Sequence, residues 1–221
     1  MSGISEQYRK LFAELLGTML LVATVVGSGI MAQNLTDDVG VQLTMNMLAT
    51  VFVLFLLISM LGPISGAHFN PAVSLVFLIT KGIGFGMFIF YVLMQLTGAF
   101  LGSVIANAMF DVPTVISSRE RIDAGAPLSE IIATAGLLLT ILLLIKHNRS
   151  LVPVGVAAWI GAAYLFTSST SFANPAVTFG RVFSESFAGI EPVSAGLFIG
   201  LQLLGGLLGL GLYKLLEGSD G

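Results

Sequence analysis

The chain has 221 residues, of which 56% are hydrophobic and only 10% are charged, and its formal net charge is −3. A water-soluble domain carries roughly 25% charged residues, so this composition excludes most soluble enzymes and indicates a membrane protein with several spans. The nine Lys and Arg residues are scattered, so the sequence gives no indication of a nucleic-acid partner. Cysteine is absent, which excludes disulfides, thiolate metal sites and cysteine nucleophiles.

Six apolar segments are long enough to cross a bilayer. A hydrocarbon core about 30 Å thick requires about 20 apolar residues in each helix. The first segment lacks a small-residue cleavage site, so we expect a retained span rather than a signal peptide. Six crossings place both termini on the same side of the membrane. The predicted spans are residues 11–31, 43–63, 83–110, 128–145, 151–167 and 193–216.

The distribution of positive charge predicts which side carries the termini. Short cytoplasmic loops are enriched in Lys and Arg. With the N-terminus inside, six of the nine basic residues lie inside, and only Arg119, Arg121 and Arg181 lie outside. We therefore expect cytoplasmic N- and C-termini.

Two further apolar segments, residues 68–80 and 172–183, are too short to cross and contain the same Asn-Pro-Ala-Val motif. Asn is a favoured helix N-cap and Pro is favoured at the first helical position, so Asn70 and Asn174 each predict a helix start. Segments of about 10–14 apolar residues suit re-entrant half-helices. Non-helical backbone at membrane depth must be buried in protein or line a wet cavity. Two such segments that meet tip to tip predict a water-filled path.

The same landmarks recur in the same order in both halves of the chain. Each half contains three spans, an odd number, so the second copy has the opposite orientation in the membrane. We expect one channel domain over residues 1–221, built from inverted repeats at approximately 1–110 and 128–221 that the 111–127 loop joins. The paired landmarks are Glu14 and Glu130, Asn70 and Asn174, and Gln95 and Gln202.

The predicted helix starts indicate which solute the path would accept. Each half-helix directs its positive dipole end and unpaired N–H groups toward the bilayer midplane, which disfavours cations. The side chains of Asn70 and Asn174 would donate hydrogen bonds, and exposed loop carbonyls would accept them. Donors on one side and acceptors on the other suit a neutral, hydroxylated permeant.

These features resemble the aquaporins and aquaglyceroporins, the major intrinsic protein family, over essentially the whole chain. The resemblance depends on residues 65–73, on the second Asn-Pro-Ala motif and on the paired Glu and Gln residues. It implies the all-α aquaporin fold, with six transmembrane helices and two half-helices, and a homotetramer with one pore per subunit. It also implies a bacterial inner (plasma) membrane, and no cofactor or metal. The pore motifs would be Asn70, Pro71 and Ala72, and Asn174, Pro175 and Ala176.

The resemblance also places a selectivity filter at fixed offsets from the two Asn residues. Water-selective relatives carry an aromatic residue, a histidine, a small residue and an arginine there, and glycerol channels retain the arginine. This chain has four small or aliphatic residues instead, so we expect a broad, less polar constriction without a fixed cation. A similar loss of arginine occurs in bacterial aquaglyceroporins associated with arsenic resistance. The predicted filter residues are Thr50, Ala162, Ser171 and Val177.

We therefore expect a passive channel, and not an enzyme, for uncharged trivalent arsenicals, inorganic or methylated, with glycerol, urea and water. A general water and glycerol facilitator without an arsenical role is one alternative. An ion-coupled secondary transporter is another, because inverted repeats and broken helices also build carriers. A third alternative is an adhesive membrane protein with a closed pore.

Intramembrane carboxylates and a histidine beside the first motif have competing interpretations. The resemblance implies that Glu14 and Glu130 brace the re-entrant loops by accepting backbone hydrogen bonds, and a proton relay is the alternative. The backbone carbonyls of Gly66, Ala67 and His68 are expected to face the pore. A pH gate at His68 is the alternative there.

Arg181 follows Val177 by four residues, so both lie on one helical face about 6 Å apart along the axis. Arg181 would then lie at the outer mouth, where it would partly replace the missing filter cation. The competing interpretation is that Arg181 reaches the outer interface or pairs with Glu185.

Overall fold

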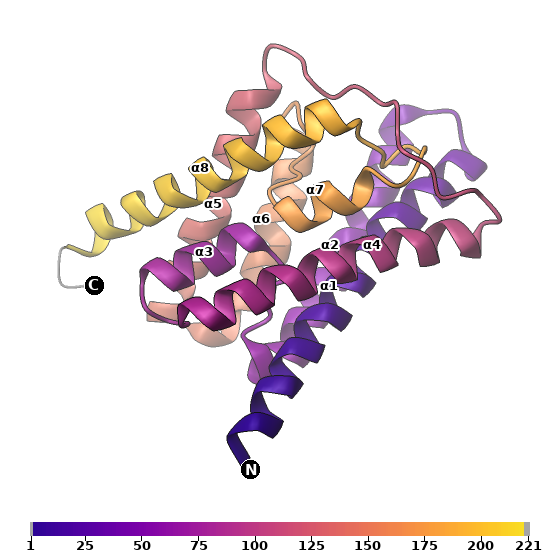
Figure 1. The fold of residues 1–221 in the computed structure, drawn as a ribbon. Coiled ribbons are helices and arrows are strands. Elements are labelled where there is room, and N and C mark those ends of the chain that lie inside the picture. Colours follow the sequence, from indigo (N-terminus) through magenta and orange to yellow (C-terminus); the bar gives the residue numbers. More distant parts are fainter. Residues whose placement is uncertain (1, 219–221) are drawn as a thin grey trace.

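The structure, a computed structural model, describes residues 2–218 as an all-helical bundle (Figure 1). Connections that contain Gly, Asn or Asp residues separate the long apolar helices. The helices are α1 (Ser2–Leu35), α2 (Val39–Ser65), α3 (Pro71–Ile79), α4 (Phe85–Met109), α5 (Ala126–His147), α6 (Val152–Phe166), α7 (Pro175–Arg181) and α8 (Pro192–Glu217), with the 3-10 turn η1 (Arg149–Leu151) before α6.

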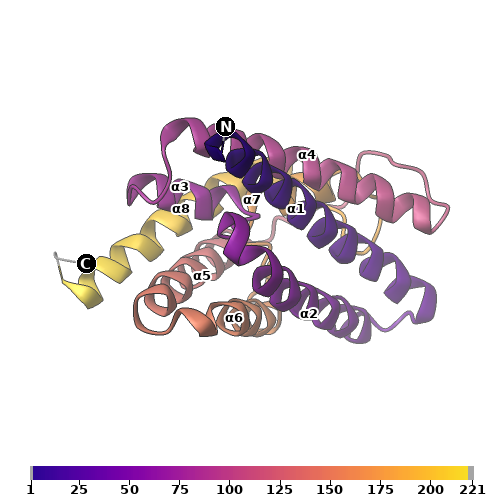
Figure 2. The same ribbon diagram turned by 90° about the horizontal axis from the view of Figure 1, so that it is seen from below.

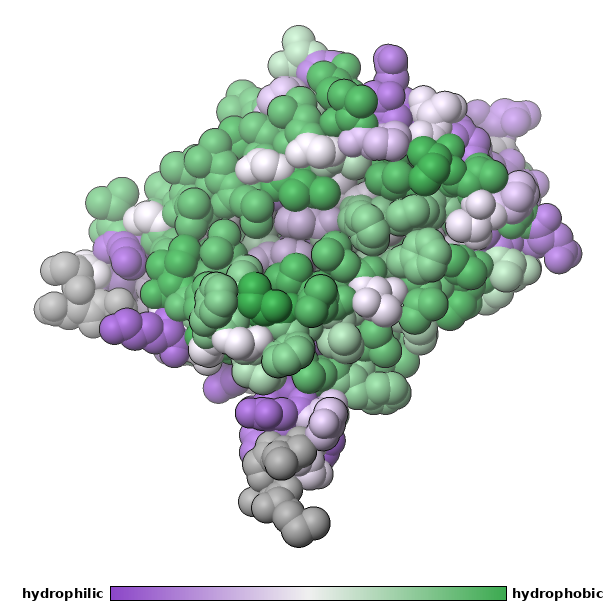
Figure 3. Space-filling model, in the orientation of Figure 1, coloured by the Kyte–Doolittle hydropathy of each residue, from purple (hydrophilic) through white to green (hydrophobic). Residues whose placement is uncertain are grey.

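Within residues 2–218, six helices are long and apolar enough to cross a membrane, namely α1, α2, α4, α5, α6 with η1, and α8. The helices α3 and α7 have only 9 and 7 residues, too few to cross. Hydrophobic side chains cover most of the face shown in Figure 3, and hydrophilic side chains gather toward its ends. The predicted fold class, with six spans and two short helices, is confirmed.

The two helices at the N-terminal end extend beyond the apolar runs that predicted them. The first turns of α1 are polar, and a salt bridge at 2.7 Å joins Glu6 to Lys10 one turn later. Helix α2 continues past Pro63 to Ser65, where Gly66 closes it with a φ of 91°. An apolar run predicts the part of a helix that lies in the hydrocarbon core. Polar first turns, as in α1, and a terminal cap, as at Gly66 in α2, determine how far the helix continues beyond it.

The helices of the two halves pack in matching pairs (Figures 1 and 2). Helix α1 packs against α4 and α2, and α5 packs against α8 and α6 in the same way. The half-helix α3 contacts α4 and α8, and α7 contacts α8 and α4. Helices α2 and α6 also pack together. Each contact within the first half therefore has a counterpart in the second, as an internal duplication requires.

Glycines allow the closest of these helix contacts. A Cβ atom added to Gly98 in α4 would lie 2.4 Å from the Leu15 carbonyl oxygen of α1. A Cβ atom added to Gly209 in α8 would lie 2.4 Å from the Ala135 carbonyl oxygen of α5. Only a hydrogen atom fits at these positions. The glycines therefore allow the close approach of α1 to α4 and of α5 to α8.

Candidate functional site

The two half-helices begin with the same cap. Asn70 precedes α3, and its Oδ1 accepts a hydrogen bond from the Ala72 N–H at 2.9 Å. Asn174 precedes α7, and its Oδ1 accepts from the N–H groups of Ala176 at 2.9 Å and Val177 at 3.3 Å. The Pro that follows each cap has no N–H to satisfy at this position. The motif thus fixes both the helix start and the direction of the carboxamide.

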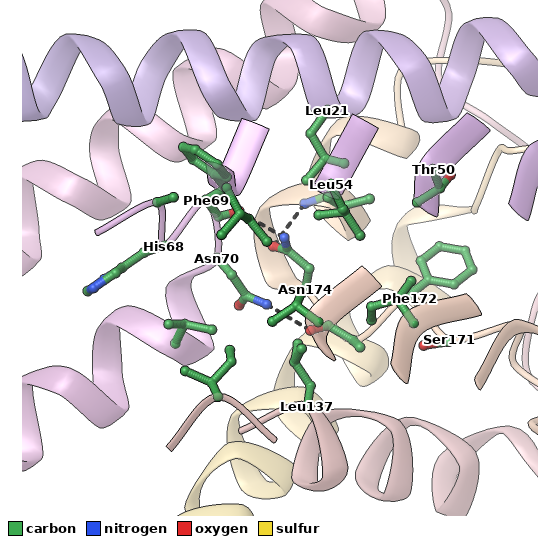
Figure 4. Close-up of a pocket in the computed structure, with 18 of the residues that line it drawn as sticks. Leu21, Thr50, Leu54, His68, Phe69, Asn70, Leu137, Ser171, Phe172 and Asn174 are labelled. Carbon is green, nitrogen blue, oxygen red and sulfur yellow. Dashed lines mark hydrogen bonds between the residues drawn. The ribbon is translucent and has the colours of Figure 1, made fainter. Parts of the chain in front are cut away.

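The same two Asn side chains join the half-helix tips. Asn70 Nδ2 donates to the Ala173 carbonyl at 2.9 Å, and Asn174 Nδ2 donates to the Phe69 carbonyl at 2.8 Å (Figure 4). A carboxamide has two N–H donors. One N–H of each Asn is therefore used across the junction, and the other remains for a molecule in the cavity that both residues line.

Glu14 of α1 holds the loop before α3. Its Oε1 accepts from Ser65 Oγ at 2.7 Å and from the His68 N–H at 3.0 Å. Its Oε2 accepts from the Phe69 N–H at 2.7 Å and from Gln95 Nε2 at 2.8 Å. The side chain is fully buried, and these are the contacts that the bracing interpretation requires.

Glu130 of α5 holds the loop before α7 in the same way. Its Oε1 accepts from Ser169 Oγ at 2.6 Å and from the Phe172 N–H at 3.0 Å. Its Oε2 accepts from the Ala173 N–H at 3.0 Å and from Gln202 Nε2 at 2.6 Å. Each buried carboxylate therefore has four donors, two of them backbone N–H groups of a re-entrant loop.

The braced loops adopt backbone conformations that are uncommon for residues with a Cβ atom. Ala67 and Phe69 have φ values of 50° and 47°, and in the second loop Ser171 and Ala173 have values of 52° and 47°. Such left-handed residues cost of order 1–3 kcal/mol each unless the surroundings hold them. The Glu–backbone hydrogen bonds supply that support, and the loop backbone lines the cavity.

An internal cavity of about 90 Å³ passes the two Asn residues. On this kind of measure a single water needs roughly 10–15 Å³, so the cavity is large enough to be wet. The loops and the Asn carboxamides form the polar part of its lining, and aliphatic side chains form much of the remainder. The aliphatic part of the lining includes Leu21, Val25, Leu54, Leu137, Ile141 and Ile160.

The structure places three of the four predicted filter residues at this cavity, and it contradicts the fourth. Thr50, Ser171 and Val177 line the cavity, and in Figure 4 Thr50 and Ser171 lie on the side of the Asn pair opposite His68. Ala162 is exposed and does not line the cavity, and Tyr164 lines it instead. Two positions along a helix correspond to a rotation of about 200°, so Ala162 faces away.

Tyr164 is the residue that counting from Asn174 missed. Its hydroxyl lies 3.2 Å from Thr50 Oγ1 and 3.2 Å from Asn46 Oδ1. Val156, Ile160 and Tyr164 all line the cavity at four-residue spacing, which is the pattern of one helical face. That spacing is the signal in the sequence that would have identified the pore-facing stripe of α6.

Arg181 is buried, so the interpretation that places it at the outer interface is wrong. The residue is 2% exposed and lines the cavity. Its Nε donates to the Ala188 carbonyl, and its guanidinium carbon lies 3.5 Å from the centroid of the Phe172 ring. Among the described residues no salt bridge joins Arg181 to Glu185, whose carboxylate accepts from the Ser118 N–H at 2.6 Å.

The His68 ring has local partners. Its Nδ1 lies 3.0 Å from Ser74 Oγ, and that hydroxyl accepts from Gln95 Nε2 at 3.0 Å. The Ser74 hydroxyl proton is then available to His68 Nδ1. The ring also packs against Phe77, with 4.6 Å between ring centroids. Among the described residues, no group of three or more His, Asp or Glu side chains could hold a metal ion.

Apolar membrane-length helices, with two half-helices that meet at an internal cavity, define a channel-type membrane protein. The family model described as Major intrinsic protein matches residues 2–171. The chain therefore belongs to the major intrinsic protein family, a family of membrane channels that are not enzymes.

Individual relatives agree with this assignment. Aquaglyceroporin AqpS from Rhizobium meliloti (strain 1021) is 47% identical over 207 residues, which cover 93% of this chain and 89% of that protein. A probable TIP-type aquaporin from Medicago truncatula is 33% identical over 217 residues, 90% of this chain and 83% of that protein. The X-ray structure of the aquaglyceroporin from Plasmodium falciparum has a TM-score of 0.69 and 21% identity, covers 94% of this chain and 96% of that one, and supports the fold.

Proposed function

We propose that this chain is a passive aquaglyceroporin channel for small uncharged solutes. The observation that carries the proposal is the reciprocal pair of hydrogen bonds by which Asn70 and Asn174 join the half-helix tips beside the cavity. One N–H of each carboxamide is left for a solute, and loop carbonyls accept its hydrogen bonds. The 47% identity to AqpS, a protein named as an aquaglyceroporin, supports the same class for this chain.

The solutes we propose are trivalent arsenicals, inorganic or methylated, together with glycerol, urea and water. Val177 occupies the position at which the glycerol channels carry arginine. This turn of α7 therefore has no guanidinium group to donate charged hydrogen bonds. Thr50 and Ser171 add little bulk. Tyr164 makes the constriction narrower than Ala162 would have made it, and its hydroxyl makes that wall more polar.

The roles of the individual residues form part of this proposal. The Asn-Pro-Ala motifs form the centre of the pore, the first loop presents its carbonyls, and the two buried carboxylates brace the loops. The repeats at approximately 1–110 and 128–221 are an inverted duplication joined by the 111–127 loop. The residues are Asn70, Pro71, Ala72, Asn174, Pro175 and Ala176 for the centre, Gly66, Ala67 and His68 for the carbonyls, and Glu14 and Glu130 for the braces.

We also propose a homotetramer in a bacterial inner (plasma) membrane, with the N- and C-termini in the cytoplasm. Large apolar side chains are exposed on several helices, for example Phe52, Phe100 and Leu165, and lipid or neighbouring subunits would cover them. In Figure 1 the first turns of α1 and the last turns of α8 lie away from the connection between α4 and α5, which agrees with six crossings. Cross-linking of the purified protein tests the tetramer.

The main alternative is a water and glycerol facilitator with no arsenical role, and Tyr164 favours it because an aromatic ring restricts the passage. Ion-coupled transport has less support. Intramembrane carboxylates are the usual sites for a coupling ion, whereas Glu14 and Glu130 each already accept four hydrogen bonds.

Purified proteoliposomes test the function directly. Light scattering after a glycerol or urea gradient should show rapid reswelling, and vesicles should take up trivalent arsenite without saturation. Dissipating ion gradients should leave these fluxes unchanged. A saturable flux that disappears with the ion gradient would indicate a carrier, and tetramers without any solute flux would indicate a closed membrane protein.

A further inference from the structure

Arg181 is a buried cation without a carboxylate partner. Across residues 2–218, the salt bridges involve Lys10, Lys146 and His147, and none involves Arg181. Removing a guanidinium from water is costly unless other groups compensate. Here the compensation comes from the Ala188 carbonyl, which accepts from Nε, and from the face of the Phe172 ring. Neither partner is negatively charged, so the positive charge stays available to act on the cavity.

The Arg181 side chain lines the cavity and has hydrogen-bond donors that no described residue accepts. Only its Nε has a hydrogen-bond acceptor among the described residues, and the side chain lines the cavity. Ser171 lines the same cavity, is 3% exposed, and has an Oγ that lacks a partner in the described part of the chain. The Arg181 guanidinium and the unpaired Ser171 hydroxyl therefore belong to residues that line the same cavity.

Arg181 lies beyond the turn that sets the width of the passage. Val177 and Arg181 both line the cavity and are one helical turn apart, about 6 Å along α7. The aliphatic side chain is on the turn next to the Asn cap, and the Arg181 backbone is on the following turn, from which the guanidinium reaches the Phe172 ring. An ion that approaches from outside therefore meets the fixed positive charge at or before the constriction.

Two more arginines add positive charge at this end. Arg121 donates to the Gly189 carbonyl at 2.8 Å and to the Phe187 carbonyl at 2.5 Å, and its guanidinium carbon lies 5.3 Å from the Phe172 ring centroid. The Arg181 guanidinium carbon lies 3.5 Å from the centroid of the same ring, so Arg121 and Arg181 share one electropositive region. Burial, together with the like charges of Arg181 and Arg119, lowers the pKa of Arg121.

We propose that Arg181, on the turn of α7 that follows Val177, is the charge-selectivity residue of this channel and excludes protons and small cations. Selection by size and selection by charge then depend on residues of successive turns of α7. The passage beside Val177 stays free for large neutral solutes, while the barrier to cations remains. This inference depends on the proposed channel function.

Substitutions at Arg181 test the proposal in proteoliposomes that contain a pH-sensitive dye. A potassium gradient with valinomycin drives protons inward, and glycerol permeability is measured on the same vesicles. Arg181→Gln should raise the proton leak by about tenfold or more, because a nearby charge in a poorly hydrated passage contributes at least that factor. Glycerol permeability should stay within about twofold of the unsubstituted protein. Arg181→Lys, which keeps the charge, should leak little.

Two further variants complete the test. Arg149→Gln is the matched control, since Arg149 is exposed and does not line the cavity, and it should raise the leak by less than about twofold. In the Arg181→Gln background, Val177→Arg should restore a low proton leak by placing a cation one turn inward. If Arg181→Gln is not monodisperse, Arg181→Met, which keeps the unbranched stem beside Phe172, replaces it.

The outcomes separate this inference from the proposed function. A folded Arg181→Gln or Arg181→Met channel that conducts glycerol and leaks no more protons than the unsubstituted protein overturns the charge-selectivity role. A large leak in Arg181→Lys overturns it as well. Absence of glycerol flux in the unsubstituted protein would instead overturn the channel function itself.

Discussion

Replacing Glu130 by Gln tests whether this buried carboxylate braces the second re-entrant loop or relays protons. The substitution keeps the shape but converts one acceptor oxygen into an NH₂ group. In either orientation the NH₂ group faces a backbone N–H, that of Phe172 at the Oε1 position or that of Ala173 at the Oε2 position. The Ser169 hydroxyl or the Gln202 carboxamide can rotate to accept from the new donor, whereas the backbone N–H cannot move without distorting the loop. One or two buried donors therefore lose their acceptor.

The expected loss of stability follows from that count. A buried donor without an acceptor costs about 1–3 kcal/mol, so Glu130→Gln should destabilise the protein by about 1–6 kcal/mol. Denaturant unfolding in detergent can be followed by the fluorescence of Trp159, the single tryptophan, which joins α6 to α5 through the Ala133 carbonyl. Glu120→Gln, at an exposed carboxylate, is the control and should have little effect.

The bracing and relay interpretations predict different results for the same variant. Bracing predicts reduced stability and reduced glycerol flux, with proton flux no lower than in the unsubstituted protein. A relay predicts a proton flux that disappears while stability matches the Glu120→Gln control. The second result would refute the reasoning from hydrogen-bond geometry.

Three other predictions concern the cavity wall and the helix contacts. Val177→Arg should reduce arsenite and glycerol uptake more than water flux, as measured by vesicle uptake and light scattering, and unchanged uptake would contradict the filter assignment. Tyr164→Ala should increase glycerol and urea flux, whereas Ala162→Val should leave both unchanged, and the reverse result would place Ala162 at the pore. Gly209→Ala should cost about 1–3 kcal/mol by overpacking, whereas Gly211→Ala, with no atom within 4 Å of its added Cβ, should not destabilise the helix, as denaturant unfolding would show.

Local chemistry explains why so much of the site could be predicted from the sequence. A helix that begins with Asn-Pro is specified by neighbouring residues, because the Asn70 side chain caps the turn that follows it. Apolar length likewise specifies which helices can cross. The matching landmarks of the two halves add long-range information, since a carboxylate that braces the first loop predicts the same role for its counterpart in the second. Glu14 accepts from backbone N–H groups of the first loop, and Glu130 accepts from those of the second.

Residues whose positions depend on the rotation of a helix or on a distant loop were not predictable in this way. Ala162 was placed by counting 12 residues back from Asn174, and that count carries no information about which face of α6 is turned to the cavity. Arg181 is buried because the loop after α7 folds back and places the Ala188 carbonyl next to its Nε. The pattern of residues around Arg181 does not indicate how that loop folds.

The hydrogen bonds of the two Asn residues limit what the centre of the pore can select. Each carboxamide oxygen caps a half-helix and one N–H of each joins the opposite loop, so only one N–H per residue remains for a solute. Two such donors beside loop carbonyls suit almost any small molecule with a hydroxyl group. Under the proposed function, discrimination between neutral solutes then depends on the ring formed by Thr50, Tyr164 and Val177, whose side chains differ in size and polarity. Changes in that ring should alter solute preference without weakening the junction, because none of its side chains takes part in the Asn hydrogen bonds across the two tips.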